Sequence, residues 1–192
     1  MDKLTRDDLY TLEAYSRERA VFRERVLAHK RPRTVAIGPN VTLVFEDRLT
    51  IQYQIQEMLR VERVFEAAGI EDELGAYNPL IPDGRNLKAT MLIEFPDAEE
   101  RVRKLAELQG IEHRIALHAG GESSAAIADE DMERSNESKT SAVHFLRFEL
   151  GAGAIAAFRR GDAVELAIDH PQYRARTVLD AVTLAALAAD FD

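Results

Sequence analysis

The stretch 88-KATMLIEFPDAEERVRKLAELQGIEHRIALH-118 decides the expected fold, because its pattern changes from strand to helix and back to strand. Residues 88–95 alternate as a half-buried strand does, with one face formed by Ala89, Met91, Ile93 and Phe95. Asp97 with Glu100 begins a helix, Gly110 ends it, and residues 112–118 form a second strand. A right-handed crossover predicts that these two strands are parallel.

Segments on both sides extend this unit into one α+β domain. Residues 34–38 and 41–46 alternate around Gly38-Pro39-Asn40, which predicts a hairpin. Further strands are expected over residues 124–128, 141–150 and 164–168, with a polar turn over 129–138. We expect a single domain over residues 1–192, with a mixed sheet of about five to seven strands, a helical N-terminal segment (1–30) and a C-terminal helix (174–189).

Composition excludes several classes of partner. The chain has 192 residues and a net charge of -9, which opposes approach to nucleic acid or to an anionic membrane surface. No apolar run approaches the roughly 18 residues of a membrane span, and residues 1–6 lack the regions of a signal peptide. We therefore expect a cytoplasmic protein that binds neither nucleic acid nor membrane.

The absence of cysteine excludes disulfides and thiolate-held zinc or iron–sulfur sites. No His-x-x-x-His pair occurs among the histidines, which are at positions 29, 113, 118, 144 and 170. We predict no metal site and assign no cofactor. One alternative stays open, a His and carboxylate metal protein that uses His144, His170 and acidic neighbours.

The helix expected over residues 48–68 carries an acid within its apolar arc. Glu62 falls near the centre of the arc formed by Ile51, Ile55, Met58, Leu59, Val61 and Phe65. A buried carboxylate needs a partner, for which Arg147 is preferred. Residues 70–87 contain Asn78-Pro79, Pro82 and Asp83-Gly84, which predicts a long loop.

Two apolar residues of that loop, Leu80 and Ile81, either anchor it to the core or are presented to a partner. Together with the apolar closing helix they suggest a homodimer. The basic cluster of residues 29–33 is expected to be a solvated helix end.

Three segments resemble a bacterial family of uncharacterised proteins: residues 45–54 (FEDRLTIQYQ), 77–84 (YNPLIPDG) and 139–148 (KTSAVHFLRF), joined by Asp169-His170-Pro171 and Tyr173. Members of that family are often encoded beside a rubrerythrin and an iron–sulfur oxidoreductase. The resemblance therefore implies a role in redox or peroxide physiology, with those redox proteins as possible partners. It supplies no catalytic residue, so whether the chain is an enzyme stays open. We expect a non-catalytic accessory or interaction protein.

A second functional interpretation is a small-molecule binder or enzyme with an anion pocket on the strand 141–150. Arg147 and His144 lie on opposite faces of that strand, each among apolar residues. The candidate ligand-binding residues are Arg147, His144, Lys139, Glu62 and Lys88. The site is expected where this strand meets the 70–87 loop. The opposing interpretation is a buried Arg147–Glu62 pair and a hydrogen-bonded core histidine.

Overall fold

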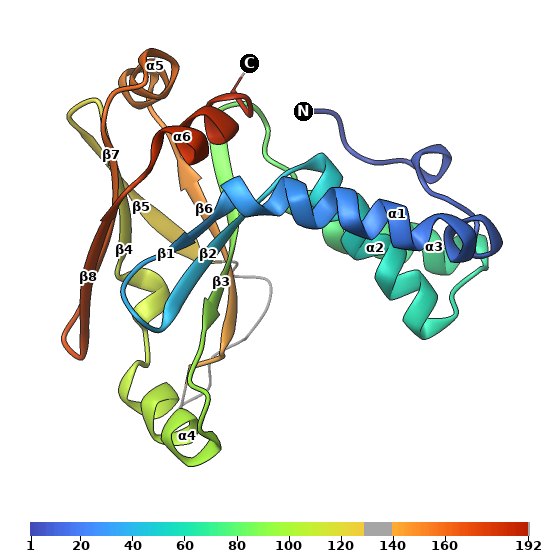
Figure 1. The fold of residues 1–192 in the computed structure, drawn as a ribbon, viewed down its shortest axis with the longest axis horizontal. Coiled ribbons are helices and arrows are strands. Elements are labelled where there is room, and N and C mark those ends of the chain that lie inside the picture. Colours follow the sequence, from blue (N-terminus) through green and yellow to red (C-terminus); the bar gives the residue numbers. More distant parts are fainter. Residues whose placement is uncertain (129–139, 192) are drawn as a thin grey trace.

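The computed structural model describes residues 1–128 and 140–191. Within these residues, an eight-stranded antiparallel sheet forms a nearly closed barrel, and three helices extend from it as a helical lobe (Figure 1). The sheet order is β1-β2-β3-β6-β5-β4-β7-β8. The strands are β1 (Thr34–Ala36), β2 (Val41–Glu46), β3 (Asn86–Ile93), β4 (Ile115–Ala119), β5 (Glu122–Ala128), β6 (Val143–Glu149), β7 (Val164–His170) and β8 (Tyr173–Val178).

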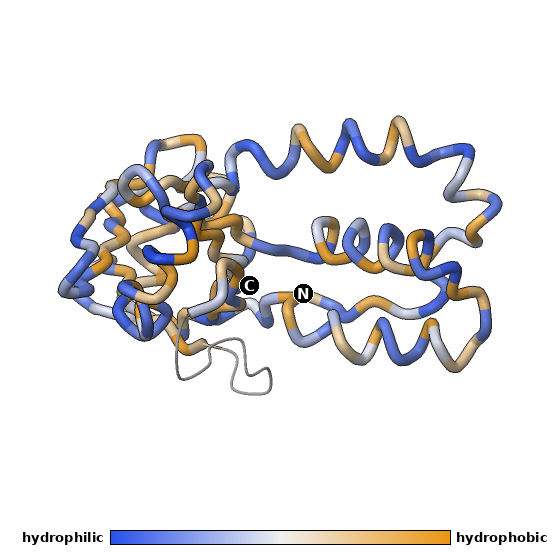
Figure 2. Tube along the Cα trace, turned by 90° about the horizontal axis from the view of Figure 1, so that it is seen from below, coloured by the Kyte–Doolittle hydropathy of each residue, from blue (hydrophilic) through white to orange (hydrophobic). Residues whose placement is uncertain are grey.

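The helices lie outside the barrel. The helical lobe consists of α1 (Leu12–Lys30), α2 (Arg48–Glu62) and α3 (Ala67–Tyr77), which lie beside the barrel in Figure 2. One end of the barrel carries α4 (Ala98–Glu107), and the opposite end carries α5 (Ala152–Arg160) and α6 (Ala181–Ala188) (Figure 1). Short 3-10 helices span residues 6–8, 31–33, 78–80 and 111–113.

Much of the local pattern is confirmed. The hairpin forms as β1 and β2, and the alternation places Val35, Ile37, Val41, Leu43 and Phe45 in the core, where all five are buried. The helix start expected at Asp97 is confirmed, since its carboxylate accepts a hydrogen bond from the backbone N–H of Glu100 at the start of α4. The apolar face of β3 is buried as expected. These features depend on neighbours in the sequence, which is why alternation and capping predict them.

The expected parallel unit is wrong. The β3–β6, β6–β5 and β5–β4 pairs are each antiparallel, so β4 runs antiparallel to β3 with two strands between them. The reason lies in α4, which buries only Leu105 within its bounds and leaves Val102 63% exposed. A helix with so narrow an apolar stripe does not cover a sheet face, as a parallel crossover requires.

The barrel is closed by side chains where its edge strands β1 and β8 meet. The Tyr173 hydroxyl donates to the carbonyl of Ile37 at 2.6 Å and accepts from the N–H of Asn40 at 3.1 Å. The Thr177 hydroxyl donates to the carbonyl of Ala36 at 2.8 Å. These bonds join strands that share no backbone ladder in the described residues.

The expected helix over residues 174–189 begins too early. Residues 173–178 alternate between half-buried and exposed and form β8, which pairs with β7 from Glu165 to His170. Asp180 caps α6, whose first residue is Ala181. The arginines at 174 and 176 face solvent, as the period of a strand requires. The final count of strands therefore exceeds the expected five to seven.

The helical lobe also corrects the expected helix and loop. Helix α2 ends at Glu62 because Arg63 takes a left-handed conformation, with φ 57°, and α3 then occupies the first part of the expected loop, up to Tyr77. Glu62 is exposed at this end, so the predicted buried pair with Arg147 is wrong. Ile81 is buried and Leu80 packs on the lobe's core, so both anchor the chain.

Replacing Gly38 tests the seam of the barrel, by which we mean the side-chain hydrogen bonds that Tyr173 and Thr177 make between the edge strands. Gly38 has φ +73°, and a Cβ there would lie 2.6 Å from the Tyr173 hydroxyl oxygen. Gly110 has φ +82° and open space around its Cβ position. Both Gly→Ala changes impose left-handed strain of about 1–2 kcal/mol. We expect Gly38→Ala to lower the free energy of unfolding by about 1 kcal/mol more than Gly110→Ala, because it also displaces a bonded hydroxyl. Equal losses in urea unfolding would contradict this account of the seam.

Candidate anion-binding site

Two cationic side chains face each other across the outer surface of the sheet. Lys88 of β3 is the direct Cα partner of Arg147 on β6, and Glu46 of β2 is the partner of Lys88 on its other side. Directly opposed residues in an antiparallel pair point to the same face. This outer face lies where the barrel meets the helical lobe, and there Glu46 is buried and Lys88 half-buried.

The ammonium of Lys88 has no hydrogen bond or ion pair with any residue that the structure describes. Burial lowers the pKa of Lys88 below its ordinary value, and the positive charges of Arg147 and Lys3 lower it further. The carboxylates of Glu149 and Asp83 act in the opposite direction without reversing the shift. Lys88 is therefore a partly desolvated cation that lies among charges of both signs and is paired with none of them in the described residues.

Glu46 does not neutralise Lys88 although it stands beside it in the ladder. One oxygen of Glu46 accepts from the Thr90 hydroxyl at 2.7 Å, and the other lies 3.8 Å from the ammonium of Lys30. That second oxygen is buried without a hydrogen bond. Glu46 is thus directed to Lys30, the last residue of α1, and not to Lys88.

Arg147 keeps donors for a ligand. Its side chain is 39% exposed and pairs through one terminal nitrogen with Glu149 on the same strand. A guanidinium carries five N–H donors in a planar fork, so donors remain beyond the nitrogen that pairs with Glu149. The fork suits the two oxygens of a carboxylate or phosphate.

Lys3 completes the cluster and was missed by the sequence analysis. Its ammonium donates to the carbonyls of Asn78 and Ile81, both at 2.9 Å, and so fixes the N-terminal segment against the chain that leads into β3. Nothing in the sequence signals this approach, because it depends on a contact between distant segments. The strand 141–150 does adjoin the 70–87 segment, since the backbone N–H of Leu150 donates to the carbonyl of Arg85 at 3.2 Å.

The other predicted site residues lie elsewhere. His144 is buried inside the barrel, with its Nε2 atom 2.8 Å from the Thr140 hydroxyl and 3.0 Å from the carbonyl of Ser141. It therefore does not line the outer face with Arg147. Glu62 is exposed in the helical lobe. Lys139 and the expected 129–138 turn lie outside the described residues.

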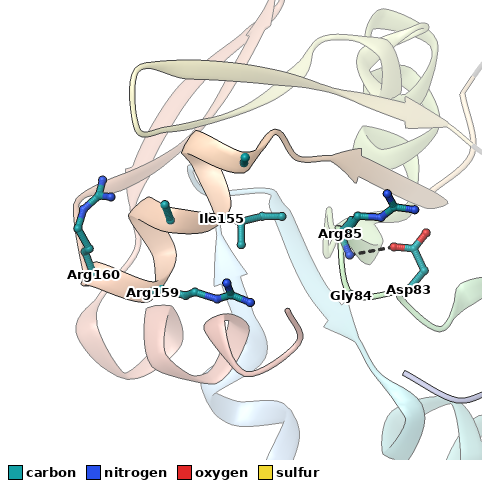
Figure 3. A pocket seen from close by; sticks show the side chains of 8 residues that line it. Asp83, Gly84, Arg85, Ile155, Arg159 and Arg160 are labelled. Carbon is teal, nitrogen blue, oxygen red and sulfur yellow. Dashed lines mark hydrogen bonds between the residues drawn. The ribbon is translucent and has the colours of Figure 1, made fainter. Parts of the chain in front are cut away.

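A cavity of about 550 Å³ adjoins the cluster at the barrel end that carries α5. Figure 3 shows Ile155 facing the turn that carries Asp83, Gly84 and Arg85, whose backbone N–H donates to the Asp83 carboxylate. The cavity has an apolar floor from α5 and an arginine rim, Arg85, Arg159 and Arg160. All three arginines are exposed, and Arg160 pairs with Asp162, so none of them is a desolvated charge. The half-buried Lys88 is the stronger candidate for a ligand contact.

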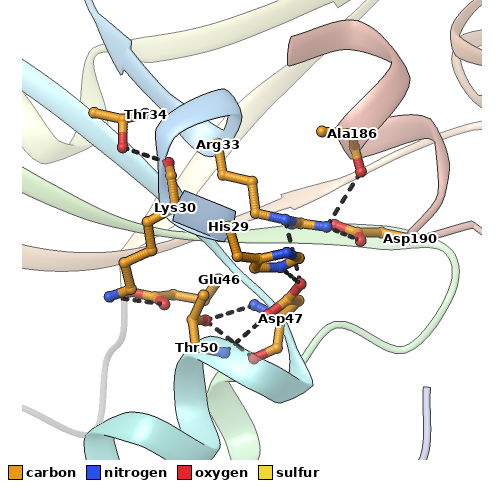
Figure 4. Close-up of polar contacts among 9 residues, drawn as sticks. All are labelled: His29, Lys30, Arg33, Thr34, Glu46, Asp47, Thr50, Ala186 and Asp190. Carbon is orange, nitrogen blue, oxygen red and sulfur yellow. Dashed lines mark hydrogen bonds and ion pairs between the residues drawn. The ribbon is translucent and has the colours of Figure 1, made fainter. Parts of the chain in front are cut away.

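The basic cluster of residues 29–33 is part of a buried ion network, which corrects the expectation of a solvated helix end (Figure 4). Arg33 is 3% exposed and binds both oxygens of Asp190, with one bond of 2.9 Å, while its Nε lies 3.2 Å from Asp47. His29 contacts the same Asp47 oxygen at 2.5 Å. The network joins α1, the start of α2 and the C-terminal segment, so its role is structural.

A family model described as "Protein of unknown function (DUF3501)" matches residues 3–191. The chain belongs to the DUF3501 family. It is also similar to a protein of unknown function from Burkholderia pseudomallei K96243, whose crystal structure was determined at 1.90 Å resolution. The sequences are 49% identical, the match covers 100% of both chains, and the TM-score is 0.94. The chain matches no curated protein at a significant level.

These matches confirm the resemblance to a family of uncharacterised proteins with a bacterial member. They do not test the expected gene neighbourhood. Among the described helices of this DUF3501 protein, none is both long and apolar enough to cross a membrane.

The described residues of this DUF3501 protein offer no arrangement of ligands that supports the metal-binding alternative. No three His, Asp or Glu side chains gather there in a way that could hold an ion. His144 and His170, the histidines proposed for it, are engaged separately. The Nε2 atom of His170 lies 3.2 Å from the carbonyl of Gln109, and its Nδ1 accepts from the N–H of Gln172.

Asp190→Asn tests the ion network. The change leaves the buried Arg33 charge with less compensation, and we expect it to lower the free energy of unfolding by about 3 kcal/mol. Asp162→Asn is the matched control, because Asp162 pairs with Arg160 where both side chains are well exposed, and its expected cost is at most about 0.5 kcal/mol. Urea unfolding measures both. Similar losses would show that the buried pair adds no special stability.

Proposed function

We propose that this DUF3501 protein binds a small oxyanion, a carboxylate or phosphate, on the outer face of β3 and β6. The observation that carries the proposal is the half-buried ammonium of Lys88, which has no hydrogen bond or ion pair within the described residues and lies beside Arg147 and Lys3. Withdrawing a cation from water is costly unless a counter-charge replaces the solvent. An oxyanion between Lys88 and Arg147 supplies that charge.

The overall charge strengthens the argument. In a chain of net charge -9, cations are in the minority, yet three of them gather at one place. Glu149 pairs with Arg147, and Asp83 acts on both Lys3 and Lys88, but both carboxylates are exposed and neither forms an ion pair with Lys88 in the described residues. A ligand that brings its own negative charge gains from all three cations, with the Arg147 fork setting its orientation.

Lys88→Met and Arg147→Lys test this binding site. Lys88→Met removes the central charge, and Arg147→Lys keeps the charge but loses the fork, so we expect both to weaken binding of lactate and of inorganic phosphate in calorimetric titrations. The controls are Lys104→Met, a lysine paired with Glu107 on α4, and Arg176→Lys, a strand arginine paired with Glu165. Neither control should change the affinity.

The pH dependence has a definite sign. Lys88 binds an anion only while it is protonated, so we expect the affinity to fall as the pH rises. Because the pKa of Lys88 is lowered, this fall begins at a lower pH than the ordinary lysine value of 10.5 would give. The charged groups facing Lys88 are Arg147, Lys3, Asp83 and Glu149, with Glu46 as its ladder partner. Wild type without lactate or phosphate binding, or variants equal to wild type, would overturn the proposal.

We also propose, from the family resemblance, that this is a cytoplasmic accessory protein in a redox or peroxide setting, with the redox proteins encoded nearby as partners. The supporting observation is the exposed apolar pair Val61, at the end of α2 and 62% exposed, and Phe65, in the turn that follows and 71% exposed. Isolated apolar side chains are common on surfaces, but two so close in the chain suit an interface.

Phe65→Ser tests whether this turn supports a homodimer, in which a twofold axis would place the same turn of two copies in contact. We expect wild type to scatter light as a species of twice 21.6 kDa and Phe65→Ser to shift towards the mass of one chain. Val102→Ser is the control, since Val102 is 63% exposed on α4. A wild type that stays at 21.6 kDa over a wide concentration range would end the homodimer proposal.

A further inference from the structure

We propose that Lys88 is a nucleophilic amine that forms an imine with a 2-oxo acid, whose carboxylate is held by Arg147. This inference rests on the proposed oxyanion site and names its substrate class. It starts from the placement of one amine beside one guanidinium on a half-buried face.

The first step of the argument is the state of the amine. A protonated lysine is no nucleophile, and enzymes that use lysine as one desolvate it or place a second cation beside it. Both conditions hold here, because burial and the charges of Arg147 and Lys3 lower the pKa of Lys88. A larger share of Lys88 is therefore the free amine at neutral pH than for an exposed lysine.

The second step is the geometry. Directly opposed residues of an antiparallel pair have Cβ atoms about 4.5–5.5 Å apart, so Lys88 and Arg147 start side by side on one face, and the charge of Arg147 acts on the Lys88 amine. In a 2-oxo acid the ketone carbon is bonded directly to the carboxylate carbon. A carboxylate seated on the Arg147 fork therefore brings the ketone carbon within reach of Lys88. Neither an isolated aldehyde nor a simple carboxylate uses both residues.

The step balances without an oxidant or reductant. The neutral nitrogen of Lys88 attacks the ketone carbon, a C–N bond forms, and the carbonyl electron pair moves to oxygen, which takes up one of the two protons of the amine. The second amine proton leaves with the hydroxyl in the next step. The carbinolamine then loses its hydroxyl as water while the nitrogen electron pair closes the C=N bond. Amine and ketone become imine and water.

The other described lysines serve as internal standards. Lys3 donates to two carbonyls, Lys104 pairs with Glu107, and Lys30 lies against the Glu46 carboxylate. Each of these contacts favours the charged form, whereas Lys88 has no such contact in the described residues. Burial lowers the pKa of Lys3 as well, so Lys104, which is paired on α4, is the standard for comparison.

Reductive trapping tests the inference. The intact protein is incubated at neutral pH with pyruvate and cyanoborohydride, and each lysine is quantified by peptide mass mapping. We expect Lys88 to be labelled at least about fivefold faster than Lys104, because a positioned carbonyl reacts faster than one free in solution. Labelling of Lys88 no faster than of Lys104 would overturn the inference.

Two further arms separate the roles of the residues. Arg147→Met should slow labelling of Lys88 by pyruvate but not by acetaldehyde, which lacks a carboxylate, while Arg176→Met should change neither. An equal loss with both reagents would mean that Arg147 only supports the fold, and would overturn its positioning role. Lactate has the carboxylate without the ketone, so lactate binding without pyruvate trapping refutes the imine and keeps the oxyanion site. Failure of both refutes both proposals.

Discussion

The buried pair of Arg33 with Asp190 holds together three segments that are far apart in sequence. Arg33 follows α1, Asp190 lies near the end of the chain, and Asp47, which also contacts Arg33, caps α2. The cap itself is a reciprocal one between Asp47 and Thr50. A charge at 3% exposure is tolerable only with such partners, so the joint between barrel and helical lobe is fixed where they meet.

The partial burial of Lys88 on the outer face of the sheet depends on this joint between the barrel and the helical lobe. On an isolated barrel, Lys88 and Arg147 would be ordinary solvated residues of an outward-facing row. The helical lobe leaves only part of that row open, and Lys3 arrives on the N-terminal segment that packs against residues 78–81. Desolvation of Lys88 is thus a product of how the two parts join, and not a property of β3 alone.

The sequence predicted what local periodicity controls and failed where distant contacts decide. The hairpin, the caps and the buried face of β3 followed from spacing. The direction of β4 did not, because α4 carries too little apolar surface to cross a sheet face. The sequence indicated a solvated Arg33, because its partner Asp190 is 157 positions away in the chain and cannot be found from local spacing. Lys88 and Arg147 were identified as candidates, while their register and the third cation, Lys3, needed the structure.

The seam between β1 and β8 gives the barrel an unequal resistance to opening. Every other junction between neighbouring strands is a ladder of backbone hydrogen bonds, whereas this one depends on the hydroxyls of Tyr173 and Thr177. Side-chain bonds can release one at a time without unravelling a strand. The seam is therefore where local opening of the barrel begins. The amide protons of β1 should exchange with solvent long before those of the central strand β6.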